Sequence, residues 1–173
     1  MKTQRYAKDD QRGFTMIELL IGVVIVGIVA SLAVPNLQQA YDKSELRAGS
    51  RELESTLSKA RSMAISTKRP YGVYIDPEAL TFTLFRNDDD PSTTALTNMD
   101  STLRVDTLPD QFRYVYVDLD NNAVVFQPNG SAQVSGYGSI NLGAETDNMM
   151  ASFSMNITPA TGRVDCYSHF YAW

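Results

Sequence analysis

Hydrophobic residues are concentrated in one uninterrupted segment near the N-terminus of the chain. From Phe14 to Val34, the only polar side chains are Thr15, Glu18 and Ser31. At about 1.5 Å per residue, a helix over this segment would be roughly 32 Å long, which is enough to cross the hydrocarbon core of a bilayer. The pattern therefore predicts a transmembrane helix over residues 14–34.

After Pro35 the hydrophobic residues take the three- and four-residue spacing of an amphipathic helix. One stripe is formed by Leu46, Leu53, Leu57, Ala60 and Ala64, and charged residues fill the other faces. Pro70 is a signal for the end of the helix. We therefore expect a second, amphipathic helical half over residues 35–69, with its apolar stripe packed under a β-sheet.

The remaining residues, 70–173, alternate between polar and apolar side chains with the two-residue period of β-strands. Strands are expected at residues 71–75, 80–85, 103–107, 112–117, 123–126, 150–157 and 162–167. The polar, turn-rich stretch Asn87–Asp100 is expected to be a long exposed loop. This order, one long helix followed by an antiparallel sheet, predicts an α+β domain.

Glu18 is the one charged residue inside the apolar segment. A carboxylate in a membrane span is costly and is therefore a functional hypothesis in itself. If the chain were cut after Gly13, the new amine of Phe14 would lie one helical turn from Glu18 and could neutralise it. Two alternatives remain: a plain single-pass anchor, and an ordinary secretory signal peptide cleaved near Ser31-Leu32-Ala33.

The residues Gly13-Phe14-Thr15, Glu18-Leu19-Leu20 and Pro35-Asn36 resemble the class III signal peptides of type IV pilins and type II secretion pseudopilins. The resemblance implies that residues 1–13 are a leader, which a prepilin peptidase removes after Gly13 before it methylates Phe14. It also implies that residues 14–34 hold the subunit in the inner membrane, and later pack against other pilins in a filament core. Glu18 would then pair with the Phe14 amine of a neighbouring subunit, and Pro35 would kink the helix.

Further segments resemble the GspH/FimT family of minor pseudopilins and minor pilins. They are residues 52–64, Tyr71-Gly-Val73, Phe126-Gln-Pro-Asn-Gly130 and Gly162-Arg163-Val164. The resemblance implies a pilin-like fold and a structural subunit near the tip of a filament, assembled by an inner-membrane platform. A type IV pilus and a type II secretion pseudopilus both fit, and the second would contact secreted cargo. The alternative is a membrane-anchored periplasmic binding domain that does not polymerise.

Charge is distributed unevenly along the chain. The first 13 residues contain Lys2, Arg5, Lys8 and Arg12, so the positive-inside rule places the N-terminus in the cytoplasm and the C-terminal domain in the periplasm. Residues 36–69 carry seven basic and four acidic side chains, whereas residues 71–173 carry four basic and thirteen acidic ones. Nucleic acid is therefore not an expected partner, because phosphate binding needs a basic surface. A local basic cluster, such as Lys59, Arg61, Lys68 and Arg69, is the one candidate for a DNA role.

The candidates for site chemistry are few. Cys166 is the only cysteine, so no intrachain disulfide can form, and it lies three residues from the only histidine, His169. One such pair lacks the other ligands of a closed metal site. Asp118, Asp120 and Asn122 have the alternating oxygen ligands of calcium loops but not the downstream glycine and glutamate of an EF-hand. We expect no metal, cofactor or catalytic activity, with this loop as the weak calcium candidate.

Overall fold

The computed structural model describes residues 14–90, 92–134, 138–146 and 149–172, and for residues 32–36 and 172 it describes only the backbone. The expected leader, residues 1–13, therefore lies outside the described residues, as does Gly13. The chain divides into two compact units, Met1–Gln38 and Gln39–Trp173.

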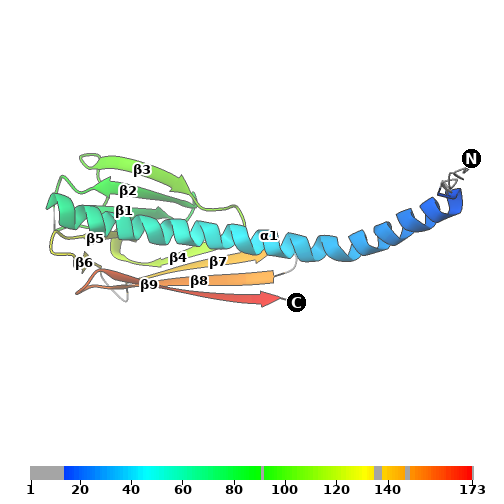
Figure 1. Cartoon of the computed structure of the whole chain (residues 1–173). Coiled ribbons are helices and arrows are strands. Elements are labelled where there is room, and N and C mark those ends of the chain that lie inside the picture. The colour runs from blue at the N-terminus through cyan, green and yellow to red at the C-terminus, as the bar shows by residue number, and fades with distance from the viewer. Residues whose placement is uncertain (1–13, 91, 135–137, 147–148, 173) are drawn as a thin grey trace, which may run out of the picture. The chain divides into compact units, whose positions relative to one another are not determined.

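Helix α1 spans Met16–Thr67 and covers most of both predicted helical segments, residues 14–34 and 35–69 (Figure 1). The helix ends where Lys68 adopts a left-handed backbone conformation, with φ of 58°. Such a residue is a common way to terminate a helix. Pro70 follows closely and cannot continue the helical hydrogen bonding. The end predicted from Pro70 thus lies within a few residues of the observed one.

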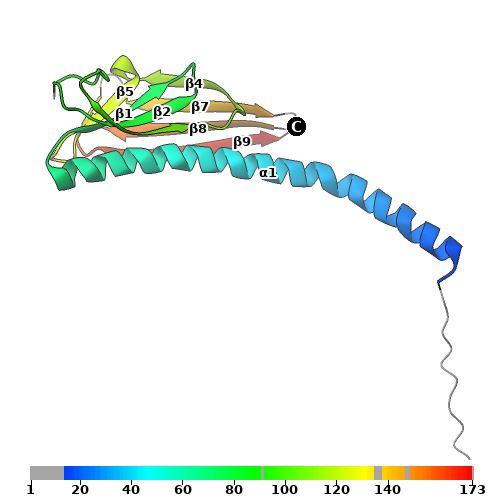
Figure 2. The ribbon, with the colours of Figure 1, turned by 90° about the horizontal axis from the view of Figure 1, so that it is seen from above.

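The second unit is built on the predicted apolar stripe of α1. Its five members are fully buried: Leu46, Leu53, Leu57, Ala60 and Ala64. They share one hydrophobic core with residues of both sheets, such as Val73 and Phe153. In two views, the part of α1 that belongs to this unit runs alongside the strands (Figures 1 and 2). The prediction that this stripe packs under a sheet is confirmed.

The strands form two antiparallel sheets. The first has the order β3-β2-β1-β5-β6 and the second the order β4-β7-β8-β9. The strands of the first sheet are β1 (Tyr71–Asp76), β2 (Thr81–Arg86), β3 (Ser101–Thr107), β5 (Ala123–Phe126) and β6 (Ala132–Gln133). Those of the second are β4 (Phe112–Asp118), β7 (Ser139–Thr146), β8 (Met149–Thr158) and β9 (Arg163–Ala172). A short 3-10 helix, η1 (Asp120–Asn122), precedes β5.

The pilin-like α+β order is confirmed, and the strands differ from the prediction in three respects. There are two sheets instead of one, β6 and β7 were not predicted, and β9 extends five residues beyond the predicted end at Tyr167. β7 has the expected alternation, because Ile140, Leu142 and Ala144 are buried on one face. Gly143 interrupts its side-chain pattern, since glycine is usually unfavourable inside a strand.

Two strand glycines lie beneath aromatic rings. A Cβ at Gly143 would be 1.8 Å from Cζ of Tyr114, so the Tyr114 ring occupies the place of the missing side chain. In the first sheet, a Cβ at Gly72 would be 2.3 Å from Cζ of Phe85, its cross-strand partner. An aromatic ring over a glycine restores the contact area that the glycine lacks.

Three segments distant in sequence meet at Arg61 of α1. Its Nε donates a hydrogen bond of 3.1 Å to the carbonyl oxygen of Gly130, in the β5–β6 turn. The amide of Ala132 donates to the carbonyl of Pro159, in the β8–β9 turn, at 2.8 Å. A Cβ at Gly162, whose φ is +61°, would lie 2.3 Å from the same Gly130 oxygen. The turns at Gly130 and Gly162, which carry the resemblance to the GspH/FimT family, therefore form one structural junction with Arg61.

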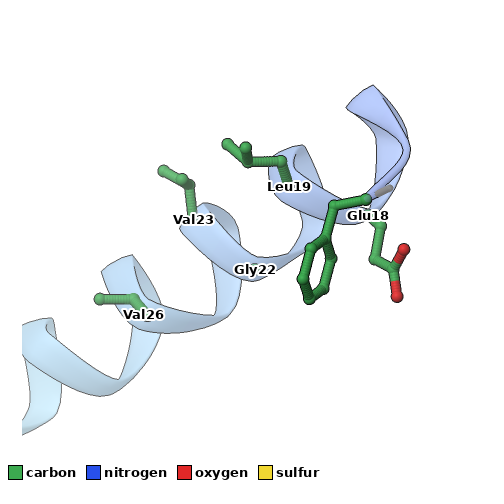
Figure 3. A pocket seen from close by; sticks show the side chains of 6 residues that line it. Glu18, Leu19, Gly22, Val23 and Val26 are labelled. Atoms are coloured by element: carbon green, nitrogen blue, oxygen red, sulfur yellow. The ribbon is translucent and has the colours of Figure 1, made fainter. Parts of the chain in front are cut away.

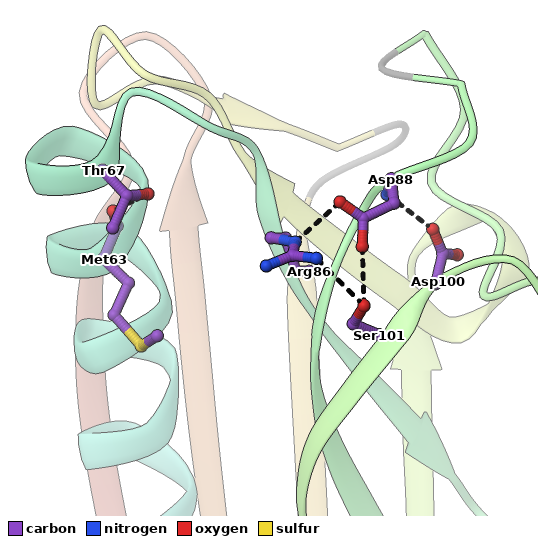
Figure 4. Close-up of polar contacts among 6 residues, drawn as sticks. All are labelled: Met63, Thr67, Arg86, Asp88, Asp100 and Ser101. Carbon is purple, nitrogen blue, oxygen red and sulfur yellow. Dashed lines mark hydrogen bonds and ion pairs between the residues drawn. The ribbon is translucent and has the colours of Figure 1, made fainter.

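The loop between β2 and β3 is closed at its base by side chains (Figure 4). Arg86 donates to one carboxylate oxygen of Asp88 at 2.6 Å, and Ser101 donates to the other at 2.7 Å. The amide of Asp88 donates to the carboxylate of Asp100 at 2.8 Å. The Arg86 hydrogen bond, followed by that from Ser101, lowers the pKa of the Asp88 carboxyl below its usual range.

The prediction of a long exposed loop over Asn87–Asp100 is wrong for two of its residues. Asn87 is 3% exposed and Thr94 is 7% exposed. The Asn87 side-chain amide donates to the carbonyls of Asp90 and Thr93, and Thr94 donates to the carbonyl of Asp120 in η1. Asn87 thus organises the interior of the loop, while Thr94 attaches the loop to the rest of the domain.

Candidate functional site

The first part of α1 exposes a continuous apolar surface. The large apolar side chains that are more than half exposed are Phe14, Met16, Ile17, Leu19, Leu20, Ile21, Val23, Val24, Ile25, Val26, Ile28 and Val29. Fully burying one such side chain stabilises by about 1.5–3 kcal/mol. Covering the whole surface is therefore worth on the order of 20 kcal/mol, which gives a strong drive to leave water.

The helix begins at a capping residue that our sequence analysis did not single out. The amide of Glu18 donates to Oγ1 of Thr15 at 3.2 Å, and the amide of Leu19 donates to the Thr15 carbonyl at 3.2 Å. Thr15 is therefore the N-cap, and Glu18 occupies the third helical position. The pattern Thr-x-x-Glu before an apolar run is the capping-box signature, so the sequence did contain this signal.

Phe14 and Glu18 line one shallow groove on the helix. The groove has a volume of about 500 Å³ and is otherwise bordered by Leu19, Gly22, Val23 and Val26. Figure 3 shows the ribbon of Gly22 without a side chain among these residues. The structure thus places the predicted processing residue Phe14 beside the predicted assembly residue Glu18.

Gly22 leaves open space in this groove, because a Cβ at this position would meet nothing within 4 Å. A glycine inside a helix costs about 1 kcal/mol relative to alanine. Nothing within the described chain offsets that cost. A glycine on a helix surface permits the close approach of another helix, as small residues do in membrane proteins.

Two further predictions concern this segment: the kink at Pro35 and the membrane span. Pro35 lies within α1, but its side chain is outside the described residues, so the predicted kink stays a prediction. In the part of the chain described with side chains, no helix combines the length and the apolar character needed to span a bilayer.

The structure does not bring Cys166 and His169 together. Both lie on β9, three positions apart, and side chains at odd separations on a strand point to opposite faces. Cys166 lies on the side facing α1, in a depression that includes Arg47 and Glu54, whereas His169 is exposed. Burial, with a smaller contribution from Glu54, raises the pKa of the Cys166 thiol. Such a thiol is a poor nucleophile at neutral pH.

The weak calcium candidate lies at the junction of β4 and β5. Asp118 ends β4, and Asp120 and Asn122 belong to η1. Across the described residues, no group of three or more acidic, histidine or cysteine side chains is arranged to hold a metal ion. Calcium binding by the Asp118–Asn122 loop stays an untested prediction.

The basic cluster considered for DNA lies at the end of α1 and in the segment that follows it. Arg61 is bonded to Gly130 in the turn junction. Lys59 is exposed on α1, and Lys68 and Arg69 lie in the connection to β1. That nucleic acid is not a partner stays a prediction.

Comparison with known proteins supports both resemblances. Residues 8–34 match the family model of the prokaryotic N-terminal methylation motif, and residues 49–159, about two-thirds of the chain, match that of type II transport protein GspH.

Two curated relatives match the N-terminal region. The type II secretion system core protein G of Escherichia coli K12 is 49% identical over 39 residues, or 22% of this chain and 27% of the relative. The type IV major alpha-pilin of Moraxella bovis is 36% identical over 63 residues, or 32% of this chain and 40% of the relative. The chain thus spans well under half the length of these relatives.

A solved structure resembles most of the chain. The type IV minor pilin FimU of Pseudomonas aeruginosa aligns with a TM-score of 0.50 and 17% identity, covering 73% of this chain and 90% of FimU. At this level of identity the similarity shows the fold alone. The match to the GspH model extends over more than half of the chain, from the amphipathic half of α1 to the end of β8. The chain therefore belongs to the GspH family of type II transport proteins and carries the prokaryotic N-terminal methylation motif at its N-terminus.

Proposed function

We propose that the chain is a minor structural subunit of a type IV filament, made as a precursor and incorporated near the filament tip. The observation that carries this proposal is the exposed apolar surface from Phe14 to Val29, which no other part of the described chain covers. A surface of this size requires lipid or other helices around it. The family match supports a filament subunit over an isolated binding domain.

Processing would create the partner of Glu18. Cleavage after Gly13 by a prepilin peptidase leaves a positively charged amine on Phe14, which lines the same groove as the Glu18 carboxylate. In a low-dielectric environment an unpaired carboxylate is strongly unfavourable, whereas a charge pair is tolerated. The pairing is made with the Phe14 amine of a neighbouring subunit during assembly, and methylation of that amine keeps its charge.

The membrane stage precedes assembly. Residues 14–34 hold the subunit in the inner membrane, with the N-terminus in the cytoplasm and the second unit in the periplasm. Transfer to the filament, at an inner-membrane assembly platform, exchanges lipid contacts for contacts with other helices. Because the apolar contacts are similar in both states, the Glu18 pair fixes the axial register of the incoming subunit. Pro35 allows the helix to bend between its lipid and periplasmic parts.

The match to GspH favours a type II secretion pseudopilus as the filament. In such a system, the periplasmic unit of a subunit near the tip would face secreted cargo. Methylation of Phe14 and pairing of Glu18 apply equally to a type IV pilus. Deletion of the secretion genes or of the pilus genes in the host, followed by assay of the subunit in sheared filaments, distinguishes the two.

The first test is the N-terminal mass of the protein from membranes, with and without the prepilin peptidase. A peptide that starts at Phe14 and carries one extra methyl group is expected only when the peptidase is present. An unchanged start at Met1, or a start near Val34, would refute the proposed processing.

Glu18→Ala tests assembly separately from processing. The variant should be cleaved normally, because the cleavage site is intact, yet it should be several times less abundant in sheared filaments than in membranes. Ser31→Ala, which removes a hydroxyl bonded only within its own helix, is the matched control. Normal filament recovery of Glu18→Ala would exclude a role of the carboxylate in register.

A further inference from the structure

The two sheets of the second unit have four edge strands, and three of them carry features that prevent pairing with other chains. Strand β6 has only two residues. In β3 the register shifts between Thr102 and Arg104, so Leu103 has no partner on β2 and forms a bulge. In β4 the register shifts between Phe112 and Tyr114, so Arg113 has no partner on β7 and forms a second bulge. Short edges and bulges in edge strands are the usual protection against edge-to-edge association.

The fourth edge strand, β9, carries none of these features. It is ten residues long, and all ten pair with β8 without a shift in register. It contains neither proline nor lysine. Among the described residues, the backbone from Val164 to Ala172 forms no hydrogen bond outside the β8 ladder. A long, regular edge of this kind is a template for an additional strand.

A row of cations on α1 runs beside this edge, and we call Lys43, Arg47 and Arg51 the basic flank. Lys43 Nζ lies 4.7 Å and Arg47 Cζ 4.8 Å from the centroid of the Phe170 ring on β9. Arg51 and Arg47 border a depression that also includes Cys166 of β9. The flank therefore follows β9 from Phe170 to Cys166, with the helix running opposite in direction to the strand.

The basic flank has no anionic partner in the described chain. The ion pairs of the described residues involve Arg86, Arg104 and Arg163 and none of the three flank residues. Arg47 and Arg51 are exposed, and Glu54 lies at the far end of the row. The single carboxylate of Glu54 can balance at most one of these three positive charges, so the row keeps a net positive charge that an acidic partner would neutralise.

The opposite face of β9 presents Tyr167 and Tyr171, which are 53% and 60% exposed, with the exposed His169 between them. Tyrosine is enriched in protein interfaces, because a large and rigid side chain with a polar tip loses little entropy on binding. Both faces of the edge strand are therefore suited to a protein partner.

We infer that β9 receives an extended segment of a different, neighbouring filament subunit, which adds as a fifth strand with carboxylates facing the basic flank. This inference rests on the proposed filament function. The spacing fits: residues four apart on a helix advance by about 6 Å, and alternate residues on a strand advance by about 6.7 Å. Carboxylates at alternate positions of the added strand can therefore follow the flank residue by residue.

A second copy of this chain is a poorer occupant of the same edge. Antiparallel pairing of two β9 strands about their middle would bring two basic flanks together on the same face of the joined sheet. Like charges placed opposite each other across an interface disfavour association. The partner is therefore a chain of different sequence, and its segment is acidic.

The test is photo-crosslinking of the full chain in cells that assemble filaments. Benzoylphenylalanine replaces Tyr167 or Tyr171 on β9, and the control replaces Tyr116, which is 61% exposed on the bulged edge strand β4. We expect both β9 positions, but not Tyr116, to crosslink to another subunit. The crosslinked peptide, identified by mass spectrometry, should contain carboxylates at alternate positions.

Charge reversal makes the test specific for the flank. Arg47→Glu combined with Arg51→Glu should lower the crosslink yield about fivefold or more, because two attractive charge pairs become repulsive ones. Lys59→Glu, at an exposed position elsewhere on α1, should not change the yield. Circular dichroism of the purified variants checks that the fold is retained.

The remaining outcomes overturn the inference in distinguishable ways. A subunit that is present in sheared filaments without β9 crosslinks refutes the inference and leaves the filament function intact. Crosslinks to a second copy of the chain, or crosslinks unaffected by charge reversal, refute the acidic partner. Absence of the subunit from filaments refutes both the inference and the proposed function.

Discussion

Replacement of Gly162 by alanine tests the junction that holds α1 to the turns of both sheets. Gly162 has a φ of +61°, and an added Cβ would lie 2.3 Å from the Gly130 carbonyl oxygen and 3.0 Å from Nε of Arg61. The first of these atoms belongs to the backbone, so the clash cannot be relieved by rotating a side chain. Either the turn moves or the Arg61–Gly130 hydrogen bond breaks.

The expected loss of stability has two parts. Alanine in the left-handed region costs about 1–2 kcal/mol. Loss of the bond from the half-buried Arg61 guanidinium to Gly130 costs roughly 1–2 kcal/mol, near the lower end of the range for charged donors. The total is about 2–4 kcal/mol, which for a chain of this size lowers Tm by roughly 5–15 °C.

The assay is thermal unfolding of the processed protein in detergent, followed by near-ultraviolet circular dichroism. Gly22→Ala is the matched control, because its added Cβ meets nothing within 4 Å, and it should not lower Tm. The double variant with Arg61→Gln should lose less than the sum of the single variants, since both remove the same bond. A fall in Tm of less than about 2 °C for Gly162→Ala, or full additivity, would refute the reasoning.

Three further predictions concern the helix start, the loop base and the thiol. Thr15→Ala should weaken the first turn of α1 by about 1 kcal/mol, while Thr15→Ser should not; faster amide exchange in the alanine variant would show it, and equal exchange would argue against capping. Because the pKa of Asp88 is lowered on folding, its contribution to stability is present above the unfolded pKa and is lost as pH falls through the folded one. Asp88→Asn should therefore reduce the drop in Tm between about pH 6 and about pH 2, and an unchanged drop would exclude this role. Since the pKa of the Cys166 thiol is raised by burial, alkylation at neutral pH should be several times slower in the folded protein than in urea, and equal rates would contradict the burial.

The parts of the fold set by local pattern were predictable, and the parts set by pairing were not. The stripe from Leu46 to Ala64 could be recognised because its period belongs to a single helix. β7 was missed because Gly143 interrupts its pattern, and the compensating ring of Tyr114 comes from another strand. The division into two sheets likewise depends on pairings between strands distant in sequence, such as β1 with β5.

The same distinction applies to the candidate sites. The sequence identified Phe14 and Glu18, because their spacing alone places them on one helical groove. The Thr15 cap could also have been recognised from its spacing to Glu18. The β9 edge could not, because the bulges at Leu103 and Arg113 that protect the other edges are properties of register.

The aromatic rings that lie over Gly72 and Gly143 restrict the order in which these sheets can change during evolution. Phe85 is fully buried, and a Cβ at Gly72 would also lie 3.0 Å from the Val124 carbonyl oxygen. A side chain can therefore be accepted at position 72 only after position 85 has become smaller and the strands have shifted. Tyr114 is more than half exposed and can swing outward, so Gly143 is under a weaker constraint. Among relatives, positions 72 and 85 should consequently vary as a pair, and positions 114 and 143 more freely.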